Sequence, residues 1–423
     1  MKRKVFRGWY VVFAAHVLLA LSFGAAYSFG AFFSQIQAHF DAGSFSVASV
    51  FSLTAFIYYT VGVVSGALAD RVSTRVVVIA GIVLLSLGFL VSSEATHSLA
   101  LFIASFCSLV GLGIGLVYIP AVTAVQRWFV TNRSKASGLA LAGTGVGTFV
   151  GPMAAGLLMH HMSWETTMRI FAAVIATVGI SAAMLIRGSP HELGLLADGE
   201  RRRSLDPSEH RPIPPTPTRT IGLAEAIRSS RFWWYFGAIF LGSVGLFLAL
   251  VHINPYARQL GVSATESNLL IGLIGAGNVA GRLFLGRLGD RMGARRLLAC
   301  LTVALAVLNG FWFCSHSFAS LVIFAILFGV ANGGCISLYP AVAASWFGTA
   351  NLGAILGALY IAVGIAAIAG GSIGGLLFDI YQNYGLSIMF SAACALLSAV
   401  FIMIAGGRQA VLPVLRRSSE AVE

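Results

Sequence analysis

Charged residues are scarce in this chain. Only 10% of its 423 residues are Asp, Glu, Lys or Arg, and 58% are hydrophobic. Water-soluble chains carry about 25% charged residues, so the composition excludes a soluble globular protein. The apolar residues fall into many long runs, each about the length that crosses a bilayer as a helix. We therefore predict an all-α membrane protein that crosses the bilayer many times.

The chain also has few cysteines and no recognisable catalytic arrangement. The five cysteines are odd in number, lie mostly in apolar runs and show neither metal-ligand spacing nor a disulfide framework. No Ser/His/Asp or Cys/His constellation and no Walker loop occurs in the sequence. We therefore expect no enzyme activity, no metal, no cofactor and no use of ATP.

Acidic residues are missing from the inner parts of the apolar runs, whereas basic residues occupy the loops. The net charge of +12 would suit nucleic-acid binding if it stood alone. However, the Lys and Arg residues fill alternate short loops at 71–75, 127–135 and 291–296, as well as both terminal segments. This is the positive-inside pattern. We therefore exclude nucleic-acid binding and expect a multi-pass protein of the cell's inner membrane with both termini in the cytoplasm.

The apolar runs predict about twelve transmembrane helices in two sets of six. The expected spans are 9–36, 46–69, 75–93, 99–126, 136–159 and 167–187, then 232–257, 266–289, 296–314, 318–347, 352–378 and 385–406. Between the sets lies a polar region whose proline-rich part, 212–217, favours extended polyproline structure. We therefore predict an N-terminal bundle at 1–188, a cytoplasmic linker at 189–220 and a C-terminal bundle at 221–423.

The two sets of helices repeat one another. GALADRVSTR at 66–75 matches GRLGDRMGAR at 286–295, and LVYIPAVTAVQRWF at 116–129 matches SLYPAVAASWF at 337–347. Asp70 and Asp290 are 220 residues apart (290 − 70), and Pro120 and Pro340 have the same separation (340 − 120). Two matches at one offset predict parallel six-helix repeats, with a binding site between them at mid-depth.

Arg282 is the unusual residue of this pattern, because it stands inside an apolar run well before the basic end of that run. An arginine at such depth costs about 2.5–3.5 kcal/mol on insertion scales, and it cannot escape by losing its proton. Asn278 lies four residues earlier, so both project from one helix face. We expect Arg282 to face a water-filled cavity and bind an anion. The alternative is an arginine that snorkels to the inner headgroups.

The repeated loop motif resembles the G-x-L-x-D-R loop between the second and third helices of the major facilitator superfamily. The resemblance implies a conformational gating role for Asp70 and Arg71 and for Asp290 and Arg291. The second copy is complete, whereas the first has Ser73 where glycine is usual. An aspartate at a helix end can meet the N-terminus of a neighbouring helix, which gives the motif a physical basis.

A sharper resemblance, over nearly the whole chain, is to the monocarboxylate transporters and the related oxalate–formate antiporter branch. RGWY at 7–10 opens the first helix, although Arg7 replaces an acidic residue, and PAVT, RWF and ASGLALAG at 120–143 are similar to the helix 4–5 signature. Asn278 stands where animal members have an acidic residue four positions before an arginine, and Tyr27 stands where they have a lysine. Val363 aligns with a lysine of the oxalate–formate antiporter.

Bacterial monocarboxylate transporters resemble this chain more closely. They have a helix 4 tyrosine, a helix 7 histidine and the Asn–Arg pair, which correspond here to Tyr118, His252, Asn278 and Arg282. His252 has either a substrate or proton role or a helix–helix hydrogen bond, and Tyr118 and Tyr339 line the cavity or pack equivalently in the two repeats. Tyr27 has the same two readings.

The resemblance implies a secondary transporter, working by alternating access, of a small monocarboxylate such as lactate or pyruvate. A dicarboxylate would want two cations and this chain offers one, which also favours a monocarboxylate. We expect proton symport, with His252 as the favoured proton carrier and the substrate itself, entering as the neutral acid, as the other candidate. We also expect a monomer that needs only its substrate, protons and the bilayer. Two alternatives stay open. One is an organic-anion exchanger of the oxalate–formate type, and the other is a membrane sensor that transports nothing.

Overall fold

A computed structural model describes residues 6–42, 44–199 and 221–407. Within these residues, twelve helical spans are long and apolar enough to cross a membrane. The first set contains α1 (Gly8–His39), α2 (Ser44–Arg71), α3 (Thr74–Glu94), α4 to α5 (Leu99–Trp128), α6 (Arg133–Met159) and α7 (Trp164–Leu185). The second contains α9 (Ser230–Gln259), α10 (Ala264–Met292), α11 (Ala294–Phe313), α12 (Phe318–Phe347), α13 (Leu352–Tyr381) and α14 (Gly385–Ala405). Each expected span is found, with ends that differ by a few residues.

Serine side chains explain several of these ends. The hydroxyls of Ser163, Ser229 and Ser263 each accept a hydrogen bond from a backbone N–H of the first turn of α7, α9 or α10. Such a cap satisfies one of the donors that a helix N-terminus leaves unpaired. The helices therefore begin at polar caps, two or three residues before the apolar runs that predicted them.

The fourth span is not one regular helix. It consists of α4 (Leu99–Ser105), a π-helical turn η1 (Phe106–Val110) and α5 (Gly111–Trp128). A short helix, α8 (Leu223–Arg228), leads into α9. The described part of the polar region, up to residue 199, forms two 3-10 turns, η2 (Pro190–Leu193) and η3 (Ala197–Gly199). The proline-rich segment 212–217, for which we predict extended structure, lies outside the described residues.

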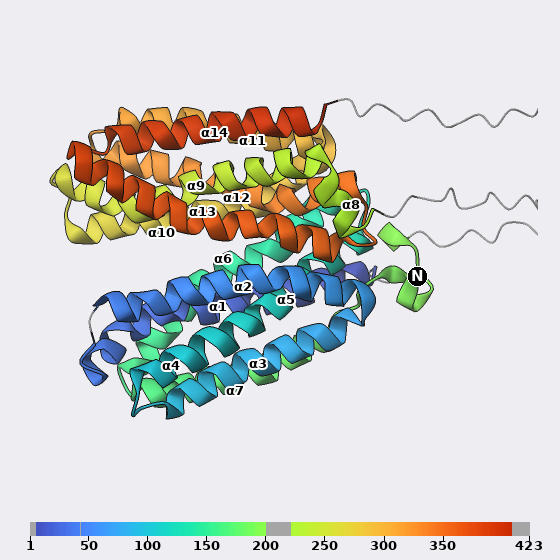
Figure 1. Cartoon of the computed structure of the whole chain (residues 1–423), viewed down its shortest axis with the longest axis horizontal. Helices are drawn as coiled ribbons and strands as arrows, with labels where there is room; N and C mark the ends of the chain where they lie inside the picture. Colours follow the sequence, from blue (N-terminus) through green and yellow to red (C-terminus); the bar gives the residue numbers. More distant parts are fainter. Residues whose placement is uncertain (1–5, 43, 200–220, 408–423) are drawn as a thin grey trace, which may run out of the picture.

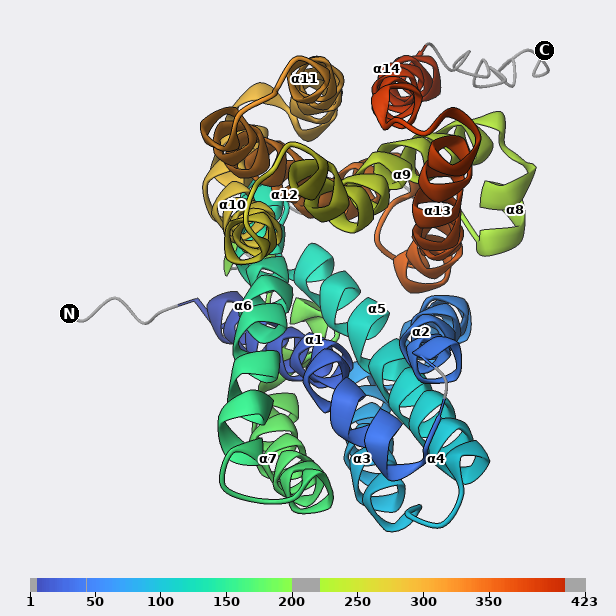
Figure 2. The ribbon, with the colours of Figure 1, turned by 90° about the vertical axis from the view of Figure 1, so that its left-hand side faces the viewer.

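The helices form two six-helix halves that meet along two equivalent seams. Within the first half α1 packs on α6 and α3 on α7, and the corresponding pairs in the second half are α9 with α13 and α11 with α14. Between the halves, α2 packs against α13 and α6 against α10. Figure 2 shows both seams from one end of the bundle. In the repeats α2 is equivalent to α10, and α6 is equivalent to α13. The internal repeat therefore maps one seam onto the other.

The halves approach each other closely at the end of the bundle that carries Asp70 and Asp290, which we call the aspartate end. They diverge toward the opposite end (Figure 1). A Cβ at Gly66 would lie 2.0 Å from the carbonyl oxygen of Gly353, so the backbones of α2 and α13 nearly touch here. The beginning of α1 and the end of α14 are also at this end, since Gly8 lies beside Phe129 and Arg295 donates to the Gly406 carbonyl.

The outer faces of the helices are strongly apolar. Large side chains such as Phe149, Phe284 and Met403 are 72%, 75% and 68% exposed. Exposed apolar surface of this extent would aggregate in water, whereas it suits the hydrocarbon of a bilayer. The buried core of the second half continues across the interface to Phe23, Tyr118 and Leu141 of the first half.

Candidate functional site

Arg282 joins the two halves of the molecule near the middle of the seam between α6 and α10. Its side chain is buried, at 8% exposure, and its Nη1 donates to the Leu141 carbonyl at 2.7 Å and to the Thr144 hydroxyl, both on α6. Gly138 permits this approach, because a Cβ there would lie 2.0 Å from the Arg282 carbonyl oxygen. Arg282 therefore points into the protein interface, and the alternative of an arginine snorkelling toward lipid headgroups is wrong.

One edge of the Arg282 guanidinium is unused. Within the described residues the Nε–Nη2 edge makes no hydrogen bond, and Nε is fully buried. No carboxylate pairs with this guanidinium among those residues. A buried donor without a partner is costly, and a buried charge more so. The free edge offers the two parallel N–H groups that a carboxylate accepts in a bidentate pair.

Tyrosines from both halves surround the guanidinium. Tyr27, Tyr59, Tyr118 and Tyr360 lie within electrostatic range of Arg282. The rings of Tyr118 on α5 and Tyr360 on α13 stack with centroids 5.6 Å apart, which links the halves a second time. Phe23 adds an edge contact to Tyr118 at 5.3 Å. The structure thus brings Tyr27 and Tyr118 to Arg282 as the sequence suggests, and it adds Tyr59 and Tyr360.

Asn278 supports the helix that carries Arg282. It is 9% exposed, and its side-chain amide donates to the side-chain oxygen of Asn332 on α12 at 3.0 Å. A Cβ at Gly333 would lie 2.0 Å from the Asn278 carbonyl oxygen, so α10 and α12 are in close contact. This pair fixes the position of α10 one turn before Arg282.

His252 and Tyr339 are oriented toward other contacts. The Nε2 of His252 lies 3.0 Å from the Gly371 carbonyl of α13, and its ring packs against Tyr384. The hydroxyl of Tyr339 lies beside Gly242 of α9, where a Cβ would be 2.9 Å away. Both residues therefore make contacts between helices of the second half. Helix–helix contact is the alternative to a substrate role for each residue. Their substrate roles stay predictions.

Asp70 and Asp290 each cap a helix of the opposite half. The Asp70 carboxylate accepts from the Gly353 and Ala354 backbone N–H groups at 3.1 and 3.0 Å, at the start of α13. The Asp290 carboxylate accepts from the N–H groups of Ser134 and Lys135 at 2.8 and 3.0 Å, at the start of α6. A carboxylate at a helix N-terminus is favoured by the helix dipole. These paired caps hold the aspartate end together.

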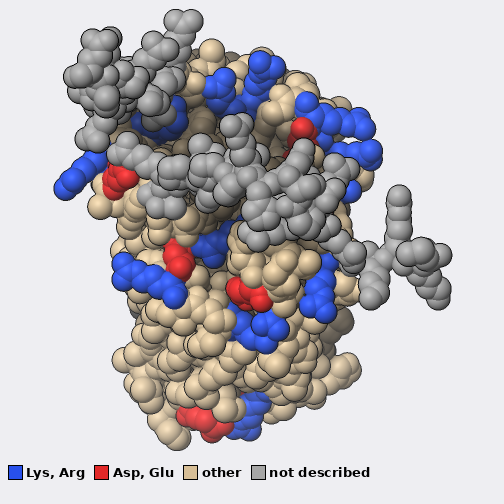
Figure 3. Space-filling view, turned by 90° about the vertical axis from the view of Figure 1, so that its right-hand side faces the viewer, with Lys and Arg blue, Asp and Glu red and all other residues tan. Residues whose placement is uncertain are grey.

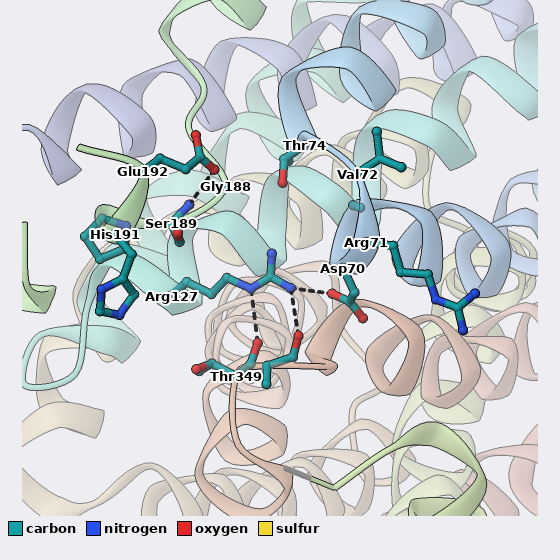
Figure 4. A pocket seen from close by; sticks show the side chains of 13 residues that line it. Asp70, Arg71, Val72, Thr74, Arg127, Gly188, Ser189, His191, Glu192 and Thr349 are labelled. Atoms are coloured by element: carbon teal, nitrogen blue, oxygen red, sulfur yellow. Dashed lines mark hydrogen bonds and ion pairs between the residues drawn. The ribbon is translucent and has the colours of Figure 1, made fainter. Parts of the chain in front are cut away.

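The Asp70 cap is reinforced by an arginine that sequence reasoning did not assign to the site. Arg127, at the end of α5, forms an ion pair with Asp70 and donates from Nε and Nη2 to the carbonyls of Thr349 and Ala350 at 3.1 and 3.3 Å (Figure 4). Its signal in the sequence is the RWF element at 127–129, whose counterpart in the matched stretch, SWF at 345–347, has Ser345 in place of the arginine. Arg71 and Arg291, by contrast, are exposed.

Two pseudo-equivalent halves, capped to each other at one end and sharing a buried cation between them, define a polytopic membrane transporter. The sequence profile described as Major Facilitator Superfamily matches residues 15–259 and 244–420. The chain belongs to this superfamily.

Curated relatives and solved structures agree with this assignment. Monocarboxylate transporter 12-B of Danio rerio is 25% identical over 94% of this chain and 86% of its own length, and monocarboxylate transporter 13 of Bos taurus is 27% identical over 91% and 86%. The agnestins efflux protein AgnL12 of Paecilomyces divaricatus is 26% identical over 93% and 86%. A crystal structure of a double-tryptophan XylE mutant shares the fold with a TM-score of 0.74 at 13% identity, over 94% of this chain and 95% of that one. FucP in its outward conformation gives 0.69 at 15% identity, over 94% and 100%.

Proposed function

We propose that this protein is a secondary active transporter of a small monocarboxylate, of the lactate or pyruvate kind, which it moves by alternating access with a proton. The observation that carries the proposal is the buried Arg282, whose Nε–Nη2 edge has no partner within the described residues. A substrate carboxylate would fill this edge and neutralise the charge. The relatives named monocarboxylate transporters support the same substrate class.

The sidedness of the protein is part of this proposal. Lys and Arg gather on the face at the aspartate end, as Figure 3 shows. Cytoplasmic loops carry an excess of these residues, so we assign this end to the cytoplasm, with the protein in the inner membrane. The division into bundles at 1–188 and 221–423, joined by a linker at 189–220, and the monomeric state also remain predictions.

Arg282 gives substrate binding a way to affect the seam between the halves. Its Nη1 ties α10 to the Leu141 carbonyl and the Thr144 hydroxyl of α6. A carboxylate on the free Nε–Nη2 edge would neutralise the guanidinium, so the Nη1 bonds to these neutral acceptors would lose their charge assistance while staying in place. Substrate binding would therefore weaken one tie between the halves and ease their relative rotation.

The surroundings of Arg282 favour one carboxylate over two. Within the part of the chain that the structure describes, the groups in electrostatic range of Arg282 are tyrosines rather than a second cation. Tyrosine hydroxyls can donate to the second carboxylate oxygen or to the oxygen at position 2 of lactate or pyruvate. A dicarboxylate would leave one charge without a counter-ion in a buried site.

Proton coupling has two candidate carriers. One is His252, because histidine as a residue type titrates near neutral pH. The other is the substrate, entering as the neutral acid. His252 already contacts the Gly371 carbonyl at 3.0 Å, and protonation would leave this bond intact while adding a second donor.

Flux in proteoliposomes tests the proposal. Purified protein should take up radiolabelled lactate or pyruvate down an imposed pH gradient, and uptake should collapse when the gradient is dissipated. Uptake that needs an internal organic anion and ignores pH would instead establish exchange of the oxalate–formate type. No flux of any carboxylate, from protein that still binds one, would favour the sensor alternative.

Two observations favour a second candidate, efflux of a larger organic acid. Among the similar proteins are the agnestins and aspyridones efflux proteins of fungi, the latter 25% identical over 93% of this chain. The aromatic residues around Arg282 would suit the rings of such a compound. Competition separates the candidates, since an aromatic carboxylate should then displace lactate at a much lower concentration than pyruvate does.

A further inference from the structure

A polar cavity of about 400 Å³ opens at the aspartate end beside the Asp70–Arg127 pair (Figure 4). It is separate from the Arg282 site and is formed by four parts of the chain. These are the α2–α3 connection, the end of α5, the 188–192 segment after α7, and Thr349 and Ala350 before α13. Since the last two residues belong to the second half, the cavity is complete only while the two halves are together at this end.

Two hydrogen-bonding groups in this cavity have no partner within the described residues. Arg127 uses Nε and Nη2 for its bonds to Thr349, Ala350 and Asp70, and its third nitrogen, Nη1, points toward Thr74 and Ser189 in Figure 4. The Thr74 side chain is only 2% exposed, and its hydroxyl points into the same space without a hydrogen bond. Neither atom is among the fully buried ones that lack a partner, so both face the open cavity, where a ligand can reach them.

Gly188 keeps the space beside the Thr74 hydroxyl open. A Cβ at residue 188 would lie 2.5 Å from that hydroxyl and 2.8 Å from Glu192 Oε1, so it would displace these groups, and the Glu192 carboxylate borders the same space. Thr74 is also the first residue of α3, a helix of 21 residues whose N-terminus favours negative charge. The arrangement thus combines a guanidinium, a buried hydroxyl and a helix N-terminus around one opening.

The nearby carboxylates do not satisfy these donors. Asp70 directs its oxygens to Arg127 and to the N–H groups of Gly353 and Ala354, while Glu192 accepts from the Ser189 N–H at 3.2 Å. Arg75, next to Thr74, donates to the Ile186 and Met184 carbonyls and, among the described residues, pairs with no carboxylate. The exposed Arg71 adds a further positive charge at the rim.

We propose that this cavity is a binding site for an oxyanion, a phosphate or carboxylate group held by Arg127 Nη1 and the Thr74 hydroxyl. Bound there, the anion stabilises the closed aspartate end, because Arg127 at the same time holds the Thr349 and Ala350 carbonyls of the other half. A ligand that binds one conformation better shifts the population toward it. The site is distinct from the Arg282 site, and its existence does not depend on which substrate Arg282 binds.

Titration with inorganic phosphate tests the proposal, using the full-length protein in phosphatidylcholine vesicles and potassium chloride of equal ionic strength as the reference. Wild-type protein should bind phosphate, and Thr74→Val and Gly188→Ala should bind it about tenfold more weakly, the loss expected for one hydrogen bond to a charged group. Thr74→Ser keeps the hydroxyl and should bind like wild type. Matched controls are Thr177→Val, on the exposed face of α7, and Gly310→Ala, where a Cβ meets nothing within 4 Å.

The outcomes separate the sources of the anion and decide the proposal. If a lipid phosphate is the natural occupant, adding phosphatidylglycerol should weaken phosphate binding by wild type and leave Thr74→Val unchanged. If a soluble anion is the occupant, phosphatidylglycerol has no effect, while phosphate on the Asp70 side slows transport by wild type but not by Thr74→Val. Equal phosphate binding by wild type, Thr74→Val and Gly188→Ala, all with wild-type thermal stability, would overturn the proposal, as would wild-type protein that binds neither phosphate nor the anionic lipid.

Discussion

At the scale of single residues, Arg282 has the clearest requirement for its own side chain. We expect Arg282→Lys and Arg282→Ala to lower the apparent affinity for substrate about 30-fold or more, the loss typical when one partner of a buried charge pair is removed. Lysine keeps the charge but loses the fork that a carboxylate fits. Lactate uptake by proteoliposomes is the measurement, and Arg287→Lys, exposed on the same helix, is the control. Wild-type uptake by Arg282→Ala would remove this residue from the site.

Val363 tests why the site would prefer one carboxylate. It is half-buried on α13, three residues after Tyr360 and therefore on the same helix face. We expect Val363→Lys to introduce a second cation and to shift relative binding toward oxalate over lactate by about tenfold, near the lower limit for a buried charge pair. Thermal-shift titration with both anions measures the ratio, with Val363→Leu as the neutral control. An unchanged ratio in folded protein would place residue 363 away from the site.

His252 carries the prediction about coupling. We expect uptake by the wild type to rise as external pH falls, because the coupled proton becomes more abundant. His252→Gln keeps a donor for the Gly371 carbonyl but cannot titrate, so it should flatten the pH profile more than it lowers binding. The initial rate of lactate uptake against pH is the measurement, with the exposed His316→Gln as control. If the variant retains the wild-type profile, the substrate proton becomes the better explanation.

At the scale of elements, the two aspartate caps differ in strength. Asp70 caps α13 and also pairs with Arg127, whereas Asp290 caps α6 by its two backbone bonds. We expect Asp70→Asn to destabilise the closed aspartate end by about 1–2 kcal/mol and Asp290→Asn by about 0.5–1 kcal/mol.

Labelling of a single cysteine measures this difference. Ser137→Cys, in a background without the native cysteines, places the probe on α6 at a site that is 1% exposed. Its labelling should accelerate most in Asp70→Asn. Glu94→Gln breaks an exposed ion pair with Arg169 at the other end of α3 and should change nothing. Equal labelling in all variants would mean that the caps do not hold this end closed.

At the scale of the whole molecule, closure depends on backbone contact along the seams. Ala at position 66 would place its Cβ 2.0 Å from the Gly353 carbonyl oxygen, and no flexible side chain can relieve that clash. We expect Gly66→Ala to hold α2 and α13 apart, to expose the Ser137→Cys probe and to lower the rate of uptake about tenfold, since overpacking costs about 1–3 kcal/mol. Gly310→Ala, where space is open, is the control. Normal uptake by Gly66→Ala would show that transport does not require α2 and α13 to close to backbone contact.

The sequence by itself determined the number of spans and their approximate ends, because a bilayer requires long apolar runs with internally satisfied backbones. It also determined the repeat, since Asp70 and Asp290 recur at one offset, and it identified Arg282 as a charge at membrane depth. The spans and the buried charge are read from neighbouring residues, and the repeat from comparing two short motifs, so none of them requires knowing which helices touch.

Only the tertiary structure decided what each polar side chain meets. Arg282 bonds to Leu141 and Thr144, some 140 residues away, while His252 turns toward Gly371. Such pairings depend on how each helix is rotated about its axis and where it crosses its neighbour, and tyrosines at equivalent depth satisfy the sequence pattern equally well. One rotation at each seam is selected by close backbone approach, of Gly138 to Arg282 and of Gly66 to Gly353. With the helices in this rotation, Tyr360 lies near the guanidinium, whereas Tyr339 packs within its own half.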